Sequence, residues 1–63
     1  MTDFTLHNEG SIALLTPISE AGTEWVSQHI PEDAMRFAGA VVIEHRYVAD
    51  IVAGITGDGL TIE

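Results

Sequence analysis

The sequence predicts an α+β domain, because segments with the two-residue period of strands alternate with segments that have the 3.6-residue period of helices. The expected order is strand, strand, helix, strand, helix, strand (ββαβαβ). It folds most simply into one domain over residues 1–63, with a four-stranded mixed sheet and both helices packed on one face. A strand–helix–strand connection is nearly always right-handed, so the last strand is expected to lie parallel to the third.

The first two strands are expected to form a hairpin. Phe4 and Leu6 alternate with polar residues, and apolar residues resume after Ser11. Residues 8–10 between them read Asn-Glu-Gly, and a three-residue loop that ends in glycine suits a type I turn followed by a residue with positive φ. A hairpin is therefore predicted around Gly10.

The first helix is expected to begin after Ser19, whose hydroxyl can cap it, and to end before Pro31. Glu20 adds negative charge to its first turn, where the helix dipole favours it. The apolar stripe of this segment includes Trp25. Gly22 costs a helix about 1 kcal/mol relative to alanine, and its presence implies close packing against another element.

The second half of the chain predicts a central strand, a helix and a short final strand. Residues 40–43 are an unbroken apolar run, typical of a strand that is covered on both faces or paired at the centre of a sheet. Apolar residues from Tyr47 to Ile55 recur at helical spacing, so they are expected to pack in the core, and Gly57 suits the helix end. Alternation resumes at residues 60–62.

The length and composition limit how the domain can be stabilised. A chain of 63 residues buries only about 60% of its unfolded surface. It contains no cysteine, and its histidines lack zinc-finger spacing, so stability must come from packing or from association, and a homodimer is one alternative. The N-terminus has no signal-peptide pattern and no apolar run is long enough for a membrane helix, so a cytoplasmic protein without membrane contact is expected.

The charge is strongly negative and indicates the kind of partner. Ten carboxylates stand against Arg36 and Arg46, which gives a formal net charge of −8. Such a field repels nucleic acid and anionic membranes and steers the protein towards a basic surface. The alternative is that the acidity only keeps the domain soluble. Each arginine is expected near carboxylates such as Glu32, Glu44 or Asp50, or else as an interface anchor.

The chain shows no pattern that indicates catalysis, a metal site or a cofactor. The three histidines match no metal-ligand spacing, and no serine lies in a nucleophile elbow. The glycines of residues 54–59 lack the lysine of a phosphate-binding loop and are better explained by helix termination. Glu32 and Asp33 follow Pro31 in what looks like a solvated loop. A non-enzyme is therefore predicted.

The candidate partner-binding residues combine surface acids with two anchor types. Trp25 and Tyr47 are expected mainly in the core, with a contact surface as the alternative for each. Carboxylates on loops and outer helix faces can mimic the phosphates of a duplex to a protein that binds one. The candidates are Glu20, Glu24, Glu32, Asp33, Arg36 and Trp25.

A resemblance is carried by several short segments spread over most of the chain. They are Asn8-Glu9-Gly10-Ser11, Trp25-Val26, Pro31-Glu32-Asp33-Ala34, the run 41–47 and Asp58-Gly59-Leu60. With these the chain resembles short uncharacterised bacterial and phage-borne acidic proteins. That family has no established activity, so no residue role carries over.

Size and charge alone suggest an analogy with anti-CRISPR proteins, which block nucleoprotein defence complexes. The leading hypothesis is thus a protein-binding inhibitor or modulator of a basic, nucleic-acid-binding partner. The alternative is a small structural or regulatory module that acts as a homodimer.

Overall fold

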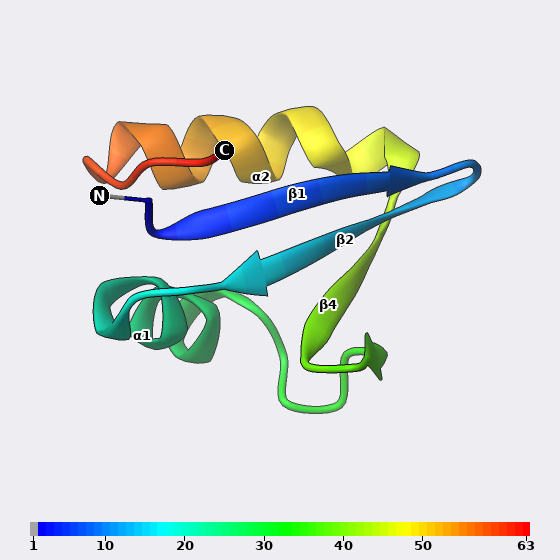
Figure 1. The fold of residues 1–63 in the computed structure, drawn as a ribbon, viewed down its shortest axis with the longest axis horizontal. Coiled ribbons are helices and arrows are strands. Elements are labelled where there is room, and N and C mark those ends of the chain that lie inside the picture. The colour runs from blue at the N-terminus through cyan, green and yellow to red at the C-terminus, as the bar shows by residue number, and fades with distance from the viewer. Residues whose placement is uncertain (1) are drawn as a thin grey trace.

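The computed structural model describes residues 2–63, which form an open four-stranded sheet and two helices (Figure 1). The elements are β1 (Phe4–Glu9), β2 (Ile12–Pro17), α1 (Glu20–His29), β3 (Arg36–Phe37), β4 (Ala40–Glu44) and α2 (His45–Gly57). The strand order is β1-β2-β4-β3, and all neighbouring strands are antiparallel. The predicted α+β class is confirmed, whereas the ββαβαβ order and the mixed sheet are wrong.

The predicted hairpin is confirmed, but its loop is shorter than expected. Glu9 pairs with Ile12, so β1 and β2 are joined by Gly10 and Ser11 alone. Gly10 has a φ of 80°, and a glycine with positive φ at the first position of a two-residue loop is the pattern of a type II′ turn. That turn matches the twist of the flanking strands, which sets the register of the hairpin.

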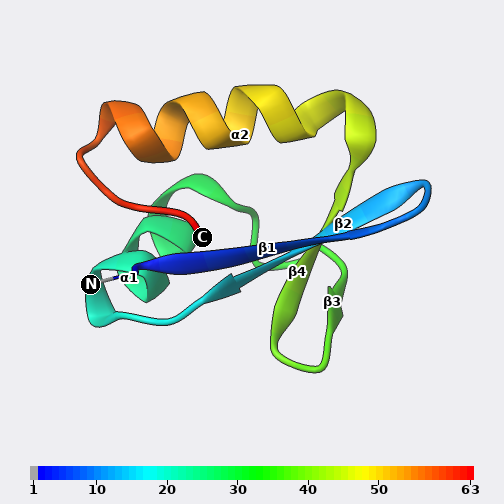
Figure 2. The same ribbon diagram turned by 45° about the horizontal axis from the view of Figure 1, so that its top comes forward.

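The structure departs most from the expected topology at the two strands predicted over residues 40–43 and 60–62. The run 40–43 forms β4, which pairs with β2 on one side and with the unpredicted β3 on the other. Both neighbouring positions of β4 are therefore occupied, and the C-terminal segment cannot pair there. It lies instead beside β1, where Ile62 forms one parallel bridge with Phe4 (Figure 2).

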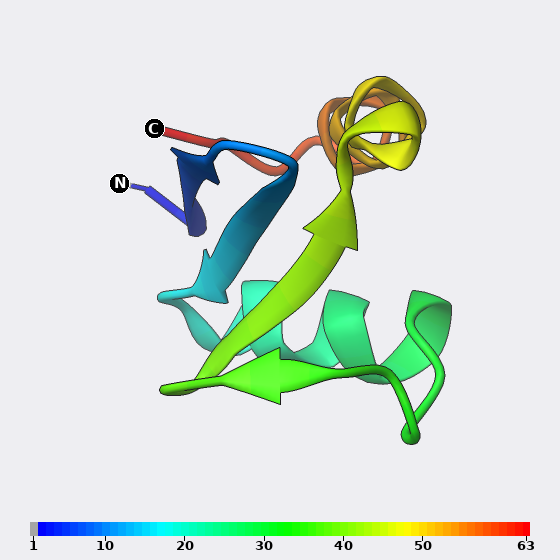
Figure 3. The same ribbon diagram turned by 90° about the vertical axis from the view of Figure 1, so that its right-hand side faces the viewer.

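Both helices pack on the same face of the sheet, as predicted. Phe4, Leu15 and Val41 project from the sheet into one buried cluster. Trp25 of α1 and Ile55 of α2 join that cluster, so each helix covers part of this face. The helices are far from parallel: Figure 3 looks down the axis of α2, whereas α1 runs across the view.

Helix α2 is only partly buried. Ile55 is its one buried residue, while Val48 and Ile51 pack against the edge of the core. Tyr47 is 48% exposed, so the expectation that its ring packs in the core is wrong. The ring instead lies under the Arg46 guanidinium, 5.1 Å from its centroid. Among residues 2–63, neither helix is long and apolar enough to cross a membrane.

Asp3 joins the start of α1 to the C-terminal segment. Its Oδ1 accepts a hydrogen bond from the Ser19 hydroxyl (2.6 Å), and its Oδ2 accepts one from the Thr61 backbone N–H (2.9 Å). These bonds favour the ionised carboxylate, the Ser19 bond most, and lower the pKa of Asp3 below its ordinary value. The Ser19 oxygen also accepts from the Gly22 N–H (3.0 Å), which confirms the predicted N-cap.

Gly22 lies where α1 passes closest to the strand layer. A Cβ atom at this position would stand 2.5 Å from the backbone oxygen of Asp3 and 3.5 Å from the Phe4 ring. That oxygen accepts a hydrogen bond from the Ile18 N–H (2.8 Å). The close packing that a glycine here implied is confirmed.

Candidate protein-binding surfaces

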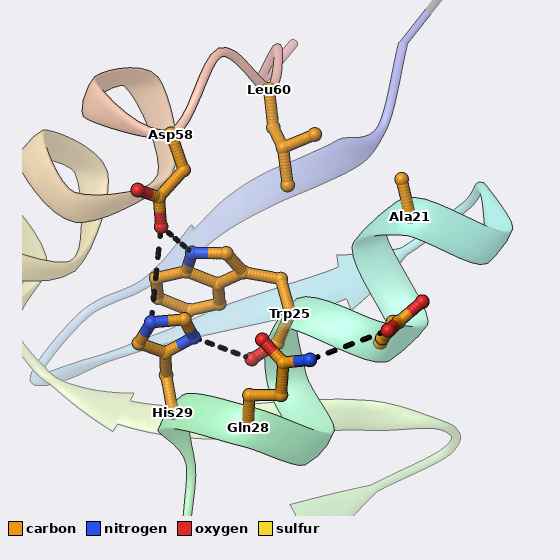
Figure 4. Close-up of a pocket in the computed structure, with 7 residues that line it drawn as sticks. Ala21, Trp25, Gln28, His29, Asp58 and Leu60 are labelled. Carbon is orange, nitrogen blue, oxygen red and sulfur yellow. Dashed lines mark hydrogen bonds and ion pairs between the residues drawn. The ribbon is translucent and has the colours of Figure 1, made fainter.

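Trp25 lies at the centre of a contact between α1 and the residue that follows α2 (Figure 4). The indole is only 7% exposed, and its Nε1–H donates a hydrogen bond to Oδ2 of Asp58 (2.8 Å). Its ring meets the Phe4 ring edge to face at a centroid distance of 6.0 Å. Trp25 therefore holds the two helices together, and its polar atom is already occupied.

His29 completes this contact from the end of α1. Its ring stacks on the indole at a centroid distance of 4.3 Å and an interplanar angle of 16°. Nδ1 lies 2.9 Å from the Trp25 carbonyl oxygen, and because a carbonyl only accepts, we place a hydrogen on Nδ1. Nε2 then faces Asp58 Oδ2 at 3.8 Å, which makes an ion pair when the ring is protonated.

Two open hollows border Glu24 on the outer side of α1. One lies against the Trp25 contact and is lined by Ala21, Glu24, Trp25, Gln28, His29, Asp58 and Leu60. The other is lined by Ile18, Ser19, Glu20, Thr23, Glu24 and Ser27. We call the three carboxylates of these hollows, Glu20, Glu24 and Asp58, the acidic helix surface. Asp58 was not among the predicted partner-binding residues, because it lies 33 residues after Trp25 in the sequence and only the fold brings the two together.

The predicted partner-binding residues do not form one cluster. Glu20 and Glu24 lie one turn apart on α1, and both are exposed. Glu32 and Asp33 are exposed in the loop that leads from α1 to β3. The sixth candidate, Arg36, is exposed on β3 and lines a different hollow from the two α1 carboxylates.

The two arginines have different surroundings. Arg46 pairs with Glu44 (Nε to Oε2, 3.2 Å), as expected. Arg36 makes no ion pair within residues 2–63, so its expected charge cluster is absent there.

The side of the sheet opposite the helices carries an apolar surface that the sequence reading missed. Side chains alternate between the two faces of a strand, so Leu14 and Val42, which pair with each other, point away from the buried residues beside them. Met35 and Phe37 extend this surface and are 72% and 65% exposed. One hollow on this side of the sheet is lined by these four residues and by Glu9, Ile12 and Arg36. We call Ile12, Leu14, Met35, Phe37 and Val42 the apolar sheet face.

The unbroken run 40–43 was the signal for this face. Its interpretation as a central strand is confirmed, because β4 lies between β2 and β3. Its interpretation as a strand covered on both faces is wrong for the described residues, since both helices pack on the other side. A fully solvated face would have alternated with polar residues, and the absence of polar residues indicates a second apolar surface.

The sheet edges offer less to a partner than this face does. Residues 61–63 cover the start of the β1 edge: the Phe4 N–H donates to the Thr61 oxygen (3.0 Å) and the Leu6 N–H to the Glu63 oxygen (3.1 Å). The opposite edge is β3, which has only two residues. Very short or covered edges limit strand addition from another chain.

Residues 2–63 contain no group of three or more His, Cys, Asp or Glu side chains that could hold a metal ion. Within this range the His29 ring stacks on Trp25, bonds its carbonyl oxygen and faces Asp58. The His29–Asp58 pair therefore serves the contact between the helices.

Comparison of the chain with protein-family models, with curated proteins and with solved structures finds no match. The fold and its surfaces define a small antiparallel α+β module with one acidic and one apolar exposed side. Its function must be argued from these two sides.

Proposed function

We propose that the chain is a non-catalytic protein-binding module whose acidic helix surface engages the basic side chains of a partner protein. The supporting observation is the arrangement of charge around Glu24, which borders two open hollows and has further carboxylates on both sides. Both arginines lie on other elements, at the start of α2 and on β3. The negative potential over α1 is therefore not neutralised locally.

The geometry of the hollows suits lysine or arginine side chains. Asp58 uses Oδ2 to accept the indole N–H, which leaves Oδ1 to accept a second donor. Glu24 accepts one long bond from Gln28 (3.3 Å) and retains further lone pairs. Charge-assisted hydrogen bonds of this kind are stronger than neutral ones. The hollow therefore offers the carboxylates of Glu24 and Asp58 as separate acceptors for the basic side chains of a partner.

The net charge extends this local preference over the whole molecule. A formal charge of −8 is confined to a body of 27 × 20 × 17 Å. Such a field accelerates encounters with basic surfaces and makes them salt-dependent. Where the partner's basic surface binds nucleic acid, occupation by this chain blocks that binding. An inhibitor of a nucleoprotein complex, as in the anti-CRISPR analogy, is the sharpest form of the proposal.

The test is an affinity pull-down from host lysate with the tagged chain at low and high salt, with the retained proteins identified by mass spectrometry. The variant Glu20→Gln/Glu24→Gln removes charge from α1. The control Glu44→Gln/Asp50→Asn removes the same charge from the other side of the molecule. We expect a nucleic-acid-binding protein that high salt or excess DNA displaces and that only the α1 variant fails to retain.

Equal loss with both variants would show that net charge, and not the acidic helix surface, drives capture. Retention that neither variant nor salt changes would contradict the proposal.

A further inference from the structure

His29 lies between the buried contact of the helices and the open hollow beside it (Figure 4). Its ring stacks on the Trp25 indole, whereas 45% of its side chain is exposed to solvent. The hydrogen on Nδ1 is held by the Trp25 carbonyl oxygen (2.9 Å), so Nε2 is the atom at which the ring gains or loses a proton. That atom faces Asp58 Oδ2 at 3.8 Å. A change in the charge of the ring therefore acts directly on Asp58.

The two states of the ring present different groups to Asp58. Neutral Nε2 carries a lone pair and Asp58 Oδ2 is also an acceptor, so the two atoms form no hydrogen bond. Protonated Nε2 carries a hydrogen and a positive charge, and it forms a charge-assisted pair with the same oxygen. That oxygen already accepts the indole N–H of Trp25 (2.8 Å), so protonation of His29 draws the carboxylate of Asp58 further towards the contact between the helices.

We propose that His29 is a pH-sensitive switch for the capture of basic side chains by the acidic helix surface. The neutral ring leaves the charge of Asp58 available to a partner, and the protonated ring neutralises that charge from within the chain. This inference rests on the proposed function, because Glu24 and Asp58 are the carboxylates that the hollow offers to a partner. It adds a condition to that function: capture is stronger above neutral pH and weaker in mildly acidic solution.

The charged groups around the ring make the switch a local one. Helix α1 contributes Glu24 to the hollow and the residue after α2 contributes Asp58, whereas no residue of the described strands lines it. The remaining lining residues, Ala21, Trp25, Gln28 and Leu60, carry no charge. The two carboxylates give this hollow a formal charge of −2, and the proton on His29 changes it to −1. Histidine is the side chain that ordinarily changes its charge between pH 5 and 8.

The expected effect on binding is modest, because the side chains of His29 and Asp58 are 45% and 54% exposed. Interactions between exposed charges change an equilibrium by up to about fivefold. We therefore expect the proton on His29 alone to weaken capture roughly threefold to fivefold between pH 8 and pH 6. His7 and His45 are also exposed and gain charge over the same range, so their effect has to be separated from that of His29.

A measurement without any partner tests the link between His29 and Asp58. The chain has a single tryptophan, so its proton–nitrogen NMR spectrum contains one indole N–H signal, and this group donates to Asp58 Oδ2. We expect that signal to shift between pH 8 and pH 6 with the same midpoint as the ring protons of His29. His29→Phe keeps a ring for the stack and should abolish the shift, whereas His45→Phe should leave it in place. An indole signal that does not follow the His29 ring would overturn the switch.

Calorimetric titration with a peptide of ten lysines tests the effect on capture. At 0.15 M salt charges are screened over about 8 Å, and the 13-residue helix α2, about 20 Å long, separates His45 from Asp58. The ratio of the Kd at pH 6 to the Kd at pH 8 should be roughly threefold smaller in His29→Phe than in the wild type. It should keep its wild-type value in His45→Phe, the matched control. Circular dichroism confirms that both variants keep the fold.

The outcomes separate the switch from the proposed function. A Kd ratio that His29→Phe leaves at the wild-type value, with the peptide still bound at pH 8, would overturn the switch alone. A wild-type chain that does not bind the peptide at pH 8, or binding that Glu20→Gln/Glu24→Gln does not weaken, would contradict the proposed function and remove the basis of the switch with it.

Discussion

The replacement Gly22→Ala tests how α1 is seated on the strand layer. In an open helix this change would stabilise the protein by up to about 1 kcal/mol. Here the new methyl group would lie 2.5 Å from the Asp3 backbone oxygen, far inside a van der Waals contact. Because the obstructing atom belongs to the backbone, it cannot rotate away, and α1 or β1 must shift.

The size of the loss can be estimated from the contacts at this point. Overpacking of this kind costs about 1–3 kcal/mol. The displaced Asp3 oxygen also accepts hydrogen bonds from the N–H groups of Ile18 (2.8 Å) and Ser19 (3.4 Å), each worth about 1 kcal/mol at most. After subtraction of the helix-propensity gain, we expect a net loss of about 2 kcal/mol. For a domain of this size that lowers Tm by about 8–16 °C.

Thermal unfolding followed by circular dichroism measures this effect. Gly57→Ala is the matched control, because a Cβ at this position in the last turn of α2 meets nothing within 4 Å. The control should be unchanged or up to about 1 kcal/mol more stable. A Gly22→Ala protein with the wild-type Tm or a higher one would refute the close approach of α1 to Asp3.

Three further predictions concern single contacts. Asp3 has a lowered pKa in the folded state, so its contribution to stability is present above its ordinary pKa of 3.8 and is lost as the pH falls through the lowered pKa. Urea titrations at several pH values should show that Asp3→Asn abolishes this decrease in the free energy of unfolding at low pH. Ala38 has a φ of 51°, which asparagine tolerates better before a glycine, so Ala38→Asn should raise Tm by a few degrees, about 0.5–1 kcal/mol. Trp25→Phe deletes the donor to Asp58 and should lower the free energy of unfolding in urea by about 1–2 kcal/mol, and an unchanged value would show that this bond is not formed in solution.

Local patterns in the sequence identified the elements that have a clear period or a cap. Ser19 and Pro31 bracket α1, whose observed bounds are Glu20–His29. The glycine at position 10 located the first hairpin, although the pairing of Glu9 with Ile12 shortened its loop. The run 40–43 became the central strand β4. These features depend on residues close together in the chain, so they can be recognised without the fold.

The features that were missed depend on partners distant in sequence. Strand β3 has two residues, too few for a period, and its turn contains Ala38 in a conformation that alanine rarely adopts. The final segment has the alternation of a strand, but its neighbour is set by which edge of the sheet is free.

The same distinction holds for the candidate site. Helical spacing placed Glu20 and Glu24 on one side of α1, whereas Asp58 lines the same hollow as Glu24 only through the packing of α2. The apolar sheet face was missed because the run 40–43 indicates only that both faces of its strand are apolar. It does not indicate whether another element covers each face.

The closure of the β1 edge by residues 61–63 has a consequence for the order of folding. The contacts of Asp3 with Thr61 join residues 58 positions apart, whereas the β1–β2 hairpin joins neighbours. Closing a long loop costs entropy before any contact rewards it, so contacts this distant form late. We expect amide hydrogen exchange to show the hairpin protected early in refolding, and the N–H of Phe4 protected only when the end of the chain has docked.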